Sequence, residues 1–516
     1  MRLTGNIRKR DIYERRDEDV DLGLLKEVPL SFSKGNLMMP LRQQDGEIVA
    51  AVSDIRGVLA LKDIAKAFNL KPRPIQTASG VILDAIGRLY GRASTAEDVI
   101  GDLSGEDLSM VATEFEAPKD LLELTEEAPI IRLLNALFHQ AVKERASDIH
   151  VEPYEKELEV RLRVDGILRK VLSPPKIIQE ALISRVKIMA NLDIAEKRLP
   201  QDGRIRLLVG GRDIDIRVSI IPTSFGERAV LRLLDRKRGL LSLSDVGLSK
   251  DNVKKMEDIL IRTNGIVLVT GPTGSGKTTT LYAAINQVKT EEKNIITVED
   301  PVEYQLEGVG QIQVNPRIGL NFASGLRSIV RQDPDIIMVG EIRDSETAEI
   351  AIQASLTGHL VLSTLHTNDA PTALTRLLDM GIEPFLVASS LYGVFAQRLV
   401  RVICPNCKKG FSPSNAELEY FEGLGRPGQL FHGIGCDKCK GKGYIGRTGI
   451  FELLIIDNEV RSMIMQRDDA KAIKEYAVSK GMKTLRMDGL DKVMQGITTL
   501  EEVLRVTQKD YADLPV

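Results

Sequence analysis

The order of apolar and polar residues along the chain follows two spacings, which indicate strands and helices. The apolar run Ile266–Val269 is typical of a buried strand, whereas Asp251–Ile261 and Leu281–Val288 have apolar residues at helical spacing. From Gly265 to about Leu399 the two patterns alternate. This alternation predicts an α/β domain with a mainly parallel sheet.

Three other segments have patterns of their own. A second α/β domain is predicted over Ile130–Leu234, where the amphipathic helix Ile131–Lys143 precedes strands that alternate apolar and charged residues. Val28–Gly91 has the pattern of a smaller α/β domain, and Asn458–Val506 is predicted to be helical.

The composition is that of a globular protein with several domains. The chain has 516 residues, of which 43% are hydrophobic and 28% charged, and its formal net charge is -3. This balance does not favour coating nucleic acid or an anionic membrane. No apolar run approaches the ~20 residues that span a bilayer, and Met1–Asp21 lacks the apolar core of a signal peptide. We therefore expect a cytosolic protein that reaches a membrane only through partners.

A glycine-rich motif, G-x-x-x-x-G-K-[ST], lies between the strand Ile266–Val269 and the helix after it. In this setting the motif cradles phosphates, because glycines let several backbone N–H groups face one anion and the helix start adds its own. Lys277 would reach the β- and γ-phosphates of a nucleoside triphosphate, and the Thr278 hydroxyl would hold Mg2+. The predicted phosphate-binding residues are Gly271, Pro272, Thr273, Gly274, Ser275, Gly276, Lys277, Thr278 and Thr279.

Two further strands end in carboxylates. Ile295–Glu303 runs into an acidic cluster that could orient the water attacking the γ-phosphate, with an exposed acidic loop as the alternative. Asp335–Asp344 contains a strand ending in Glu341, with Gly340 where a standard Walker B motif has an aspartate. Glu341 would then serve the Mg2+ sphere or polarise the attacking water, and a loop salt bridge with Arg343 is the alternative.

A histidine stands at each end of the next predicted strand. His366, close to Thr364 and Asn368, could sense the γ-phosphate, whereas His359 is expected to be structural. Neither histidine has the local spacing of a zinc ligand.

All four cysteines stand in two C-x-x-C pairs, Cys404 with Cys407 and Cys436 with Cys439. Two such pairs are typical of tetrahedral thiolate ligation of a structural Zn2+, and a redox dithiol is the alternative. We expect zinc to staple a small lobe rather than to catalyse a reaction.

Arginine is frequent between Arg161 and Arg232. Three interpretations stay open: a solvated face, a surface that completes a nucleotide site in an adjacent domain or subunit, and a nucleic-acid contact. The last is the least favoured, because the segment lacks aromatic residues on which bases could stack.

In this order, the motifs resemble those of the secretion ATPase superfamily, the hexameric motors of type II secretion, type IV pili and related machines. The resemblance extends from about Glu126 to Ile456 and includes Ser147–Pro153 and Gln201–Arg204 besides the motifs above. It implies a homohexamer that hydrolyses ATP with Mg2+, and the composition favours no nucleic-acid partner.

The resemblance also implies roles for single residues. Glu303 would be the catalytic base, Glu341 the Walker B glutamate and His366 a γ-phosphate contact. Arg204 and Arg217 are the candidates for arginines that act across domains or in trans.

The four-cysteine lobe and the N-terminal module separate assembly motors from the shorter pilus retraction ATPases. The module, with Val28–Ser33 and Gly46–Asp54, looks most like that of type II secretion ATPases, where it docks on the cytoplasmic domain of an inner-membrane platform protein.

The expected function is ATP hydrolysis that drives type II secretion through assembly of a pilin-like pseudopilus, at the cytoplasmic face of the inner membrane. A type IV pilus extension ATPase is the near alternative. A RecA-like nucleic-acid translocase and a regulatory scaffold without turnover are more distant ones.

The expected fold is a multidomain α/β chain with a RecA-like ATPase domain. The expected divisions are 1–93 (partner docking), 94–129 (acidic linker), 130–236 (arginine-rich, PAS-like), 237–400 (RecA-like ATPase), 401–446 (four-cysteine zinc lobe) and 447–516 (C-terminal helices).

Overall fold

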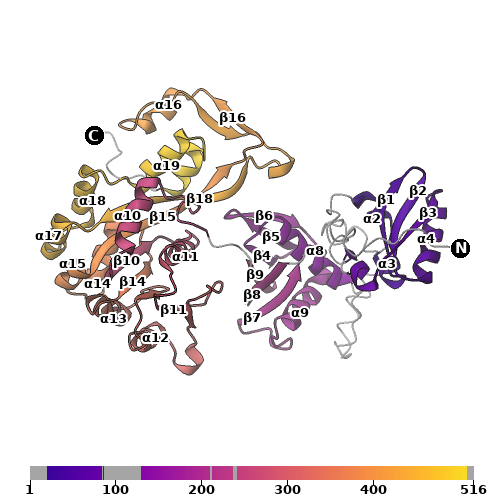
Figure 1. Ribbon diagram of the computed structural model, residues 1–516, viewed down its shortest axis with the longest axis horizontal. Coiled ribbons are helices and arrows are strands. Elements are labelled where there is room, and N and C mark those ends of the chain that lie inside the picture. The colour runs from indigo at the N-terminus through magenta and orange to yellow at the C-terminus, as the bar shows by residue number, and fades with distance from the viewer. Residues whose placement is uncertain are drawn as a thin grey trace. The chain divides into compact units, whose positions relative to one another are not determined.

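The fold is that of a computed structural model, and the structure describes residues 20–28, 30–83, 85–86, 129–209, 212–235 and 241–507 (Figure 1). The chain forms two compact units, Met1–Lys237 and Arg238–Val516, and each is described by itself. The predicted acidic linker lies outside the described residues, apart from Pro129, which begins a helix.

The first unit begins with a small three-stranded sheet. Its strand order is β1-β2-β3, with β1 and β2 antiparallel and β2 and β3 parallel. The Asp54 carboxylate caps α4 by accepting N–H bonds from Arg56 and Gly57. This module contains α2 (Leu22–Glu27), α3 (Leu30–Gly35), β1 (Met38–Gln44), β2 (Glu47–Val52), α4 (Ile55–Ala67) and β3 (Lys71–Gln76).

A six-stranded antiparallel sheet completes the first unit. Its order is β6-β5-β4-β9-β8-β7, and β5 alternates buried and half-buried residues as the sequence predicts. The buried positions pack with two helices in one core, so the charged positions form the opposite face. The elements are α8 (Pro129–Lys143), β4 (Asp148–Pro153), β5 (Leu158–Val164), β6 (Ile167–Leu172), α9 (Gln179–Met189), β7 (Gln201–Val209), β8 (Arg212–Thr223) and β9 (Gly226–Asp235).

The second unit is built on a seven-stranded sheet of order β12-β11-β13-β14-β10-β15-β18. All neighbouring strands are parallel except β15 and β18, which confirms the predicted mainly parallel sheet. The strands are β10 (Gly265–Thr270), β11 (Ile295–Glu299), β12 (Gly310–Gln313), β13 (Ile336–Val339), β14 (Leu360–Leu365), β15 (Leu391–Ile403) and β18 (Tyr444–Ile455).

Helices cover both faces of this sheet. Val267 and Val269 of β10 pack in one core with α10 and α11, whereas Ile266 and Leu268 pack in a second core with α12 to α15 and the C-terminal helices. A central strand buried on both faces explains the continuous apolar run seen in the sequence. The helices are α10 (Lys250–Leu260), α11 (Lys277–Val288), α12 (Phe322–Ile329), α13 (Ser345–Leu356), α14 (Ala370–Asp379) and α15 (Pro384–Ser390).

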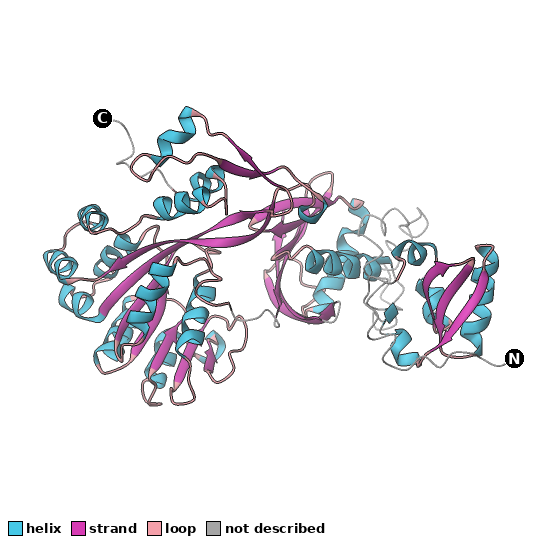
Figure 2. Ribbon diagram, turned by 45° about the horizontal axis from the view of Figure 1, so that its top comes forward, coloured by secondary structure: helices cyan, strands magenta, loops and turns pink. Residues whose placement is uncertain are grey.

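The strands β15 and β18 are long and continue past the rest of the sheet (Figure 2). Between them the chain forms the four-cysteine lobe, with a two-stranded sheet of β16 (Lys408–Phe411) and β17 (Leu430–Gly433). The seventh strand of the ATPase sheet therefore comes from residues that follow the cysteines.

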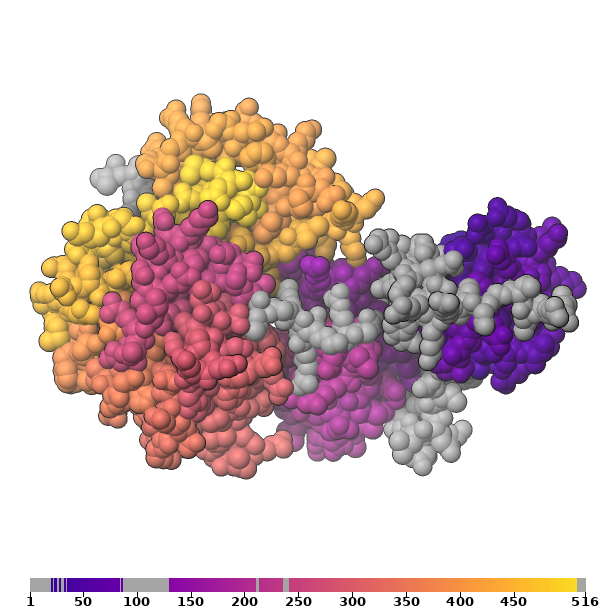
Figure 3. Space-filling model, in the orientation of Figure 1, coloured from indigo at the N-terminus to yellow at the C-terminus, as the bar shows by residue number. Residues whose placement is uncertain are grey.

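The described part of the C-terminal region is helical, as predicted, and one of its helices, α19, lies close to the segment that contains α10 (Figure 3). Its helices are α17 (Asn458–Gln466), α18 (Ala470–Ser479), α19 (Leu485–Met494) and α20 (Leu500–Val506). Across the part of the chain that the structure describes, no helix has both the length and the apolar composition needed to cross a bilayer.

Candidate functional site

The glycine-rich motif forms a loop between β10 and α11, as the sequence predicts. Gly276 has a φ of 91°, in the left-handed region that glycine adopts without strain. A Cβ atom at Gly276 would lie 2.8 Å from Nε2 of Gln397, and one at Gly271 would lie 2.6 Å from the Gln397 carbonyl oxygen. The loop therefore needs glycine both for its turn and for its close contact with β15.

Lys277 is a buried cation at the first position of α11. Its Nζ donates to the carbonyl oxygens of Gly271, at 2.8 Å, and Pro272, at 3.2 Å. Burial lowers the pKa of Lys277 to about 8, although the negative charge of Glu341 opposes this shift. Oγ of Ser275 is also buried and has no hydrogen-bond partner. An ammonium held only by carbonyls, beside an unpaired hydroxyl, fits a site that accepts an anion.

Thr278 follows Lys277 in the first turn of α11 and is half-buried. This position suits the predicted magnesium contact, because the N–H groups of the helix start would hold phosphates and a Mg2+ ion bound to those phosphates would lie close to the Thr278 hydroxyl.

Glu341 and His366 lie together at the carboxyl ends of neighbouring parallel strands. The Glu341 carboxylate is 3.3 Å from Nε2 of His366 and 2.5 Å from Nη2 of Arg343. The salt bridge that the sequence offered as an alternative therefore forms, and the same carboxylate also contacts the histidine. Gly340 holds the two strand ends together, because its carbonyl oxygen accepts a 2.7 Å bond from the Thr364 hydroxyl.

His359 stands at the opposite end of β14 from His366. Its Nδ1 is 2.8 Å from the Ala354 carbonyl oxygen, at the end of α13. This contact ties the helix end to the strand start, as expected of a structural histidine.

The acidic segment after β11 contains two kinds of carboxylate. Glu299 is buried and bonded to the hydroxyls of Tyr282 and Thr297 and to the Gln311 amide, which fixes it inside the domain. The Tyr282 oxygen also accepts a bond from the backbone N–H of Glu303. The loop that carries Glu303 is thus anchored to α11, the helix of the phosphate loop.

Two residues of β15 border the phosphate loop although no sequence motif marks them. The Gln397 amide oxygen accepts a 2.7 Å bond from the Thr280 hydroxyl, and Arg398 donates to Asn368. Their only signal in the sequence is a pair of polar residues within an apolar strand.

The four cysteine sulfurs form one cluster, in which all four Sγ atoms lie within 4.8 Å of one another. The Cys404–Cys436, Cys407–Cys439 and Cys436–Cys439 sulfur pairs are 3.8, 3.7 and 3.7 Å apart. A tetrahedral site with Zn–S bonds of about 2.3 Å requires sulfurs about 3.8 Å apart. A disulfide needs about 2.05 Å. The cluster therefore fits a structural zinc ion.

Backbone groups also prepare this cluster for a metal. The N–H groups of Cys436 and Gly443 donate to the Cys439 sulfur and lower the pKa of its thiol against the effect of burial, whereas burial raises the pKa of the Cys407 thiol. Such bonds favour the thiolate, which is the form that ligates zinc.

The arginine-rich face of the first unit is held by a few carboxylates. Arg161 and Arg228 both pair with Glu152, and Arg163 and Arg232 both pair with Asp148. This pairing accounts for a large part of the arginine excess.

The arginine candidates Arg204 and Arg217 stand opposite one another on β7 and β8 of the same sheet. Nε of Arg204 is 3.2 Å from the buried carboxylate of Asp215. They belong to the first unit, so their role toward the phosphate loop stays a prediction.

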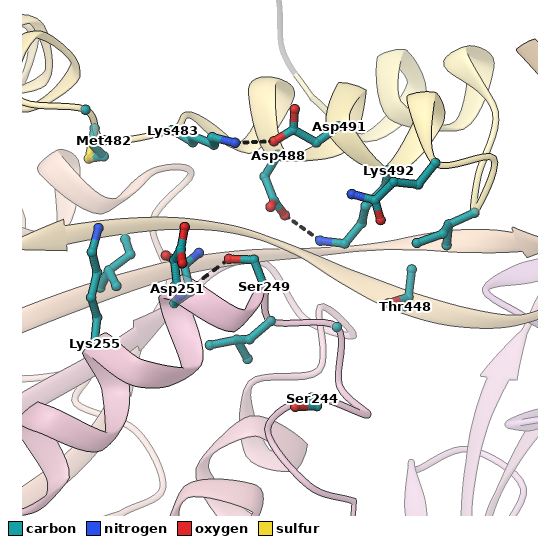
Figure 4. A pocket seen from close by; sticks show the side chains of 17 residues that line it. Ser244, Ser249, Asp251, Lys255, Thr448, Met482, Lys483, Asp488, Asp491 and Lys492 are labelled. Atoms are coloured by element: carbon teal, nitrogen blue, oxygen red, sulfur yellow. Dashed lines mark hydrogen bonds and ion pairs between the residues drawn. The ribbon is translucent and has the colours of Figure 1, made fainter. Parts of the chain in front are cut away.

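A separate polar cavity of about 380 Å3 lies between α10, β18 and α19 (Figure 4). Lys483 pairs with Asp491 at 2.5 Å and Lys492 with Asp488 at 2.6 Å. These ion pairs neutralise much of the charge that lines the cavity, and none of the phosphate-loop residues lines the cavity.

Comparison with known proteins agrees with this geometry. The family model described as Type II/IV secretion system protein matches residues 123–505, and the MshEN domain model matches residues 11–96. Among curated relatives, Type II secretion system protein E of Dickeya dadantii is 53% identical over 499 residues, covering 96% of this chain and 100% of the relative. Type II secretion system ATPase E of Vibrio cholerae is 53% identical over 450 residues, covering 86% and 88%.

A pilus protein is also similar, at lower identity. Type IV pilus assembly ATPase PilB of Myxococcus xanthus is 43% identical over 503 residues, covering 96% of this chain and 88% of the relative. Among solved structures, the pilus retraction motor PilT with bound ADP has a TM-score of 0.51 and 27% identity, covering 73% of this chain and 97% of that one. The Legionella pneumophila ATPase DotB has a TM-score of 0.55 at 22% identity, covering 75% and 97%, and supports the fold alone. The match over residues 123–505, with 53% identity to proteins of type II systems, shows that this chain belongs to the Type II/IV secretion system protein family.

Proposed function

We propose that this protein is the ATP-hydrolysing motor of a type II secretion system and drives assembly of a pilin-like pseudopilus. The observation that carries the proposal is the grouping of a phosphate loop, Lys277, Glu341 and His366 at one edge of a parallel sheet. The family membership supports the coupling to secretion.

Each residue has a role in hydrolysis. Lys277 and the loop N–H groups bind the phosphates, and Thr278 would hold Mg2+, which would supply positive charge beside the phosphate oxygens. Glu303 takes a proton from water as the water oxygen attacks the γ-phosphorus. The bond to the β,γ-bridging oxygen breaks, and ADP and phosphate leave.

Glu341 and His366 act as a pair at the γ-phosphate end. Their 3.3 Å contact lets the imidazole follow any movement of the carboxylate. Loss of the γ-phosphate would remove the anion that both face and free the segment that follows β14 to move, since β14 itself is held between β13 and β10. Arg204 and Arg217 complete the site from the first domain, across domains or in trans.

The other parts of the chain connect the motor to its setting. Zn2+ bound by Cys404, Cys407, Cys436 and Cys439 staples the lobe between β15 and β18. Residues 1–93 dock on the cytoplasmic domain of an inner-membrane platform protein. The working form is a homohexamer at the cytoplasmic face of that membrane, associated through partners. A type IV pilus extension ATPase is the second candidate, favoured by the 43% identity to PilB.

Phosphate release from the purified full chain tests the enzymatic proposal. Lys277→Ala and Glu341→Gln should each lower the rate by about 100-fold or more, since each removes a charged group of the site. Lys293→Ala, in the loop before β11, is the matched control. Full activity in Lys277→Ala would refute the proposal, and stimulation by DNA would favour the translocase instead.

Copurification of the full chain with platform proteins tests the pathway. Retention by the cytoplasmic domain of a type II secretion platform, but not by that of a type IV pilus platform, is the expected result. The reverse preference would assign the chain to pilus extension.

A further inference from the structure

Arg398 lies beside the phosphate loop on the strand next to β10. Thr270, the last residue of β10, pairs with Ala396 of β15, so Arg398 follows just beyond the point where the loop begins. A Cβ atom added to Gly271 would lie 3.2 Å from Nη1 of Arg398. The guanidinium therefore stands within reach of a ligand held by this loop.

The charge of Arg398 is not neutralised by a direct ion pair. Its Nη1 donates to its neighbour's carbonyl oxygen at 3.1 Å, and its Nη2 donates to the carbonyl and side-chain oxygens of Asn368, at 3.0 and 3.2 Å. All three acceptors are uncharged, and no described carboxylate lies within ion-pair distance. Burial accordingly lowers the pKa of Arg398.

The carboxylates that attract Arg398 from longer range are already engaged. Asp369 accepts a 2.9 Å bond from the Thr372 N–H at the start of α14. Glu452 accepts a 2.8 Å bond from the Ala370 N–H. The second oxygen of Asp369 is 3.9 Å from Nζ of Lys474, and that of Glu452 accepts from the Leu485 N–H, so both carboxylates have other partners.

Lys277, which also contacts Gly271, is in the same situation, since its Nζ contacts only carbonyl oxygens. The positive charge of Arg398 also contributes to the lowered pKa of Lys277, so the two cations act on each other. A buried cation and a half-buried one, both without direct counter-ions, cost free energy that a ligand with several negative charges would recover. A phosphate chain has that charge, and guanidinium binds phosphate in a fork geometry.

We propose that Arg398 is a phosphate-binding residue of the nucleotide site, donating to the bound phosphate chain in cis, opposite Lys277. The inference rests on the proposed ATP site and adds a second cation to it. Since Arg398 also holds Asn368, two residues after His366, nucleotide binding is linked directly to the loop between β14 and α14.

Titration calorimetry of the full chain with Mg–ADP and Mg–AMP-PNP tests this role. Arg398→Gln should weaken binding by about 10- to 100-fold, the usual cost of losing a hydrogen bond to a charged group. Arg398→Lys keeps the charge and should recover part of the affinity, although lysine cannot reproduce the fork to Asn368. Arg376→Gln on α14 is the matched control and should bind both nucleotides normally.

Comparing the affinities for the two nucleotides shows which phosphate Arg398 contacts. Weaker binding of AMP-PNP alone assigns the contact to the γ-phosphate, and weaker binding of both assigns it to the α- or β-phosphate. A purely structural role would lower the unfolding temperature of the nucleotide-free protein in both Arg398 variants, without recovery of affinity by lysine. That result, or unchanged affinity in Arg398→Gln, would overturn the proposal. Failure of Lys277→Ala to affect binding would instead refute the ATP site itself.

Discussion

Lys277 shows how burial prepares a single residue for its ligand. In this structure the ammonium is bonded only to carbonyl oxygens, and burial brings its pKa down to about 8. A phosphate placed beside it would stabilise the charged form and raise the pKa again. Nucleotide binding must therefore be coupled to protonation wherever the free lysine is partly neutral.

We predict that Mg–ADP binding takes up a proton at pH 8.5 to 9 and takes up little at pH 6.5. Below the free pKa of about 8 the lysine already carries its proton, whereas above it the proton must come from solvent. Calorimetry in two buffers of different ionisation enthalpy measures the uptake. Lys277→Arg, which stays charged throughout, should abolish it, and equal uptake by the variant would show that another group is responsible.

At the scale of elements, the order of strands determines which residues reach the site. Glu341 and His366 could be paired from the sequence, because the carboxyl ends of parallel strands share one edge of a sheet. Arg398 and Glu452 could not, because no local pattern predicts that β15 lies beside β10 and that β18 lies beside β15. That order depends on a strand that returns after the four-cysteine lobe, which no local pattern announces. The sequence likewise shows an excess of arginine, but not that Asp148 and Glu152 hold two arginines each.

Glu452 joins three elements and makes their stability depend on pH. Its carboxylate, only 1% exposed on β18, accepts N–H bonds from Ala370 and Leu485, the first residues of α14 and α19. Burial raises the pKa of Glu452 to about 7. The folded state therefore holds the proton more tightly than the unfolded state, and this contribution to stability is lost as pH rises from about 4.5 through about 7.

Relative to Glu452→Gln, the native protein should lose about 2–3 kcal/mol of unfolding free energy between pH 5 and pH 8. Denaturant unfolding of both proteins across this pH range measures the difference in unfolding free energy. The contributions of the other titratable groups cancel, because both proteins share those groups. A difference that is flat with pH, or that grows in favour of the native protein, would contradict the assignment.

The four-cysteine lobe has few buried apolar residues of its own, so a bound metal should stabilise it. We predict about one equivalent of zinc per chain by metal analysis, and loss of that zinc in Cys436→Ala. Hydrogen exchange at β16 and β17 should then accelerate, whereas Lys438→Ala, an exposed change in the same knuckle, should leave metal and exchange unaltered. Full zinc content in Cys436→Ala would rule out the four-thiolate site.

At the scale of the molecule, the ATP site and the arginine candidates belong to different compact units. Arg204 and Arg217 stand side by side on β7 and β8, with Arg204 held by the buried Asp215. A rigid pair of cations of this kind is suited to stabilising charge on a phosphoryl group that another surface presents. The motor would then turn over only when two such surfaces meet.

Mixing two inactive variants tests whether those surfaces come from different copies of the chain. One variant, Lys277→Ala, keeps the arginines but lacks a working phosphate loop, and the other, Arg204→Gln with Arg217→Gln, has the opposite defect. We expect each variant alone to lose at least about 10-fold in kcat, because an arginine finger is worth more than that in phosphoryl transfer.

If the proposed homohexamer places the arginines in trans, a mixture of the two variants contains interfaces that combine both intact parts. The mixture should then hydrolyse ATP faster than either variant alone. Lys170→Gln, a change on β6 at the opposite edge of the same sheet, should remain active and serves as the control. A mixture no faster than its components, at concentrations where subunits exchange, would place the arginines and the phosphate loop in one chain.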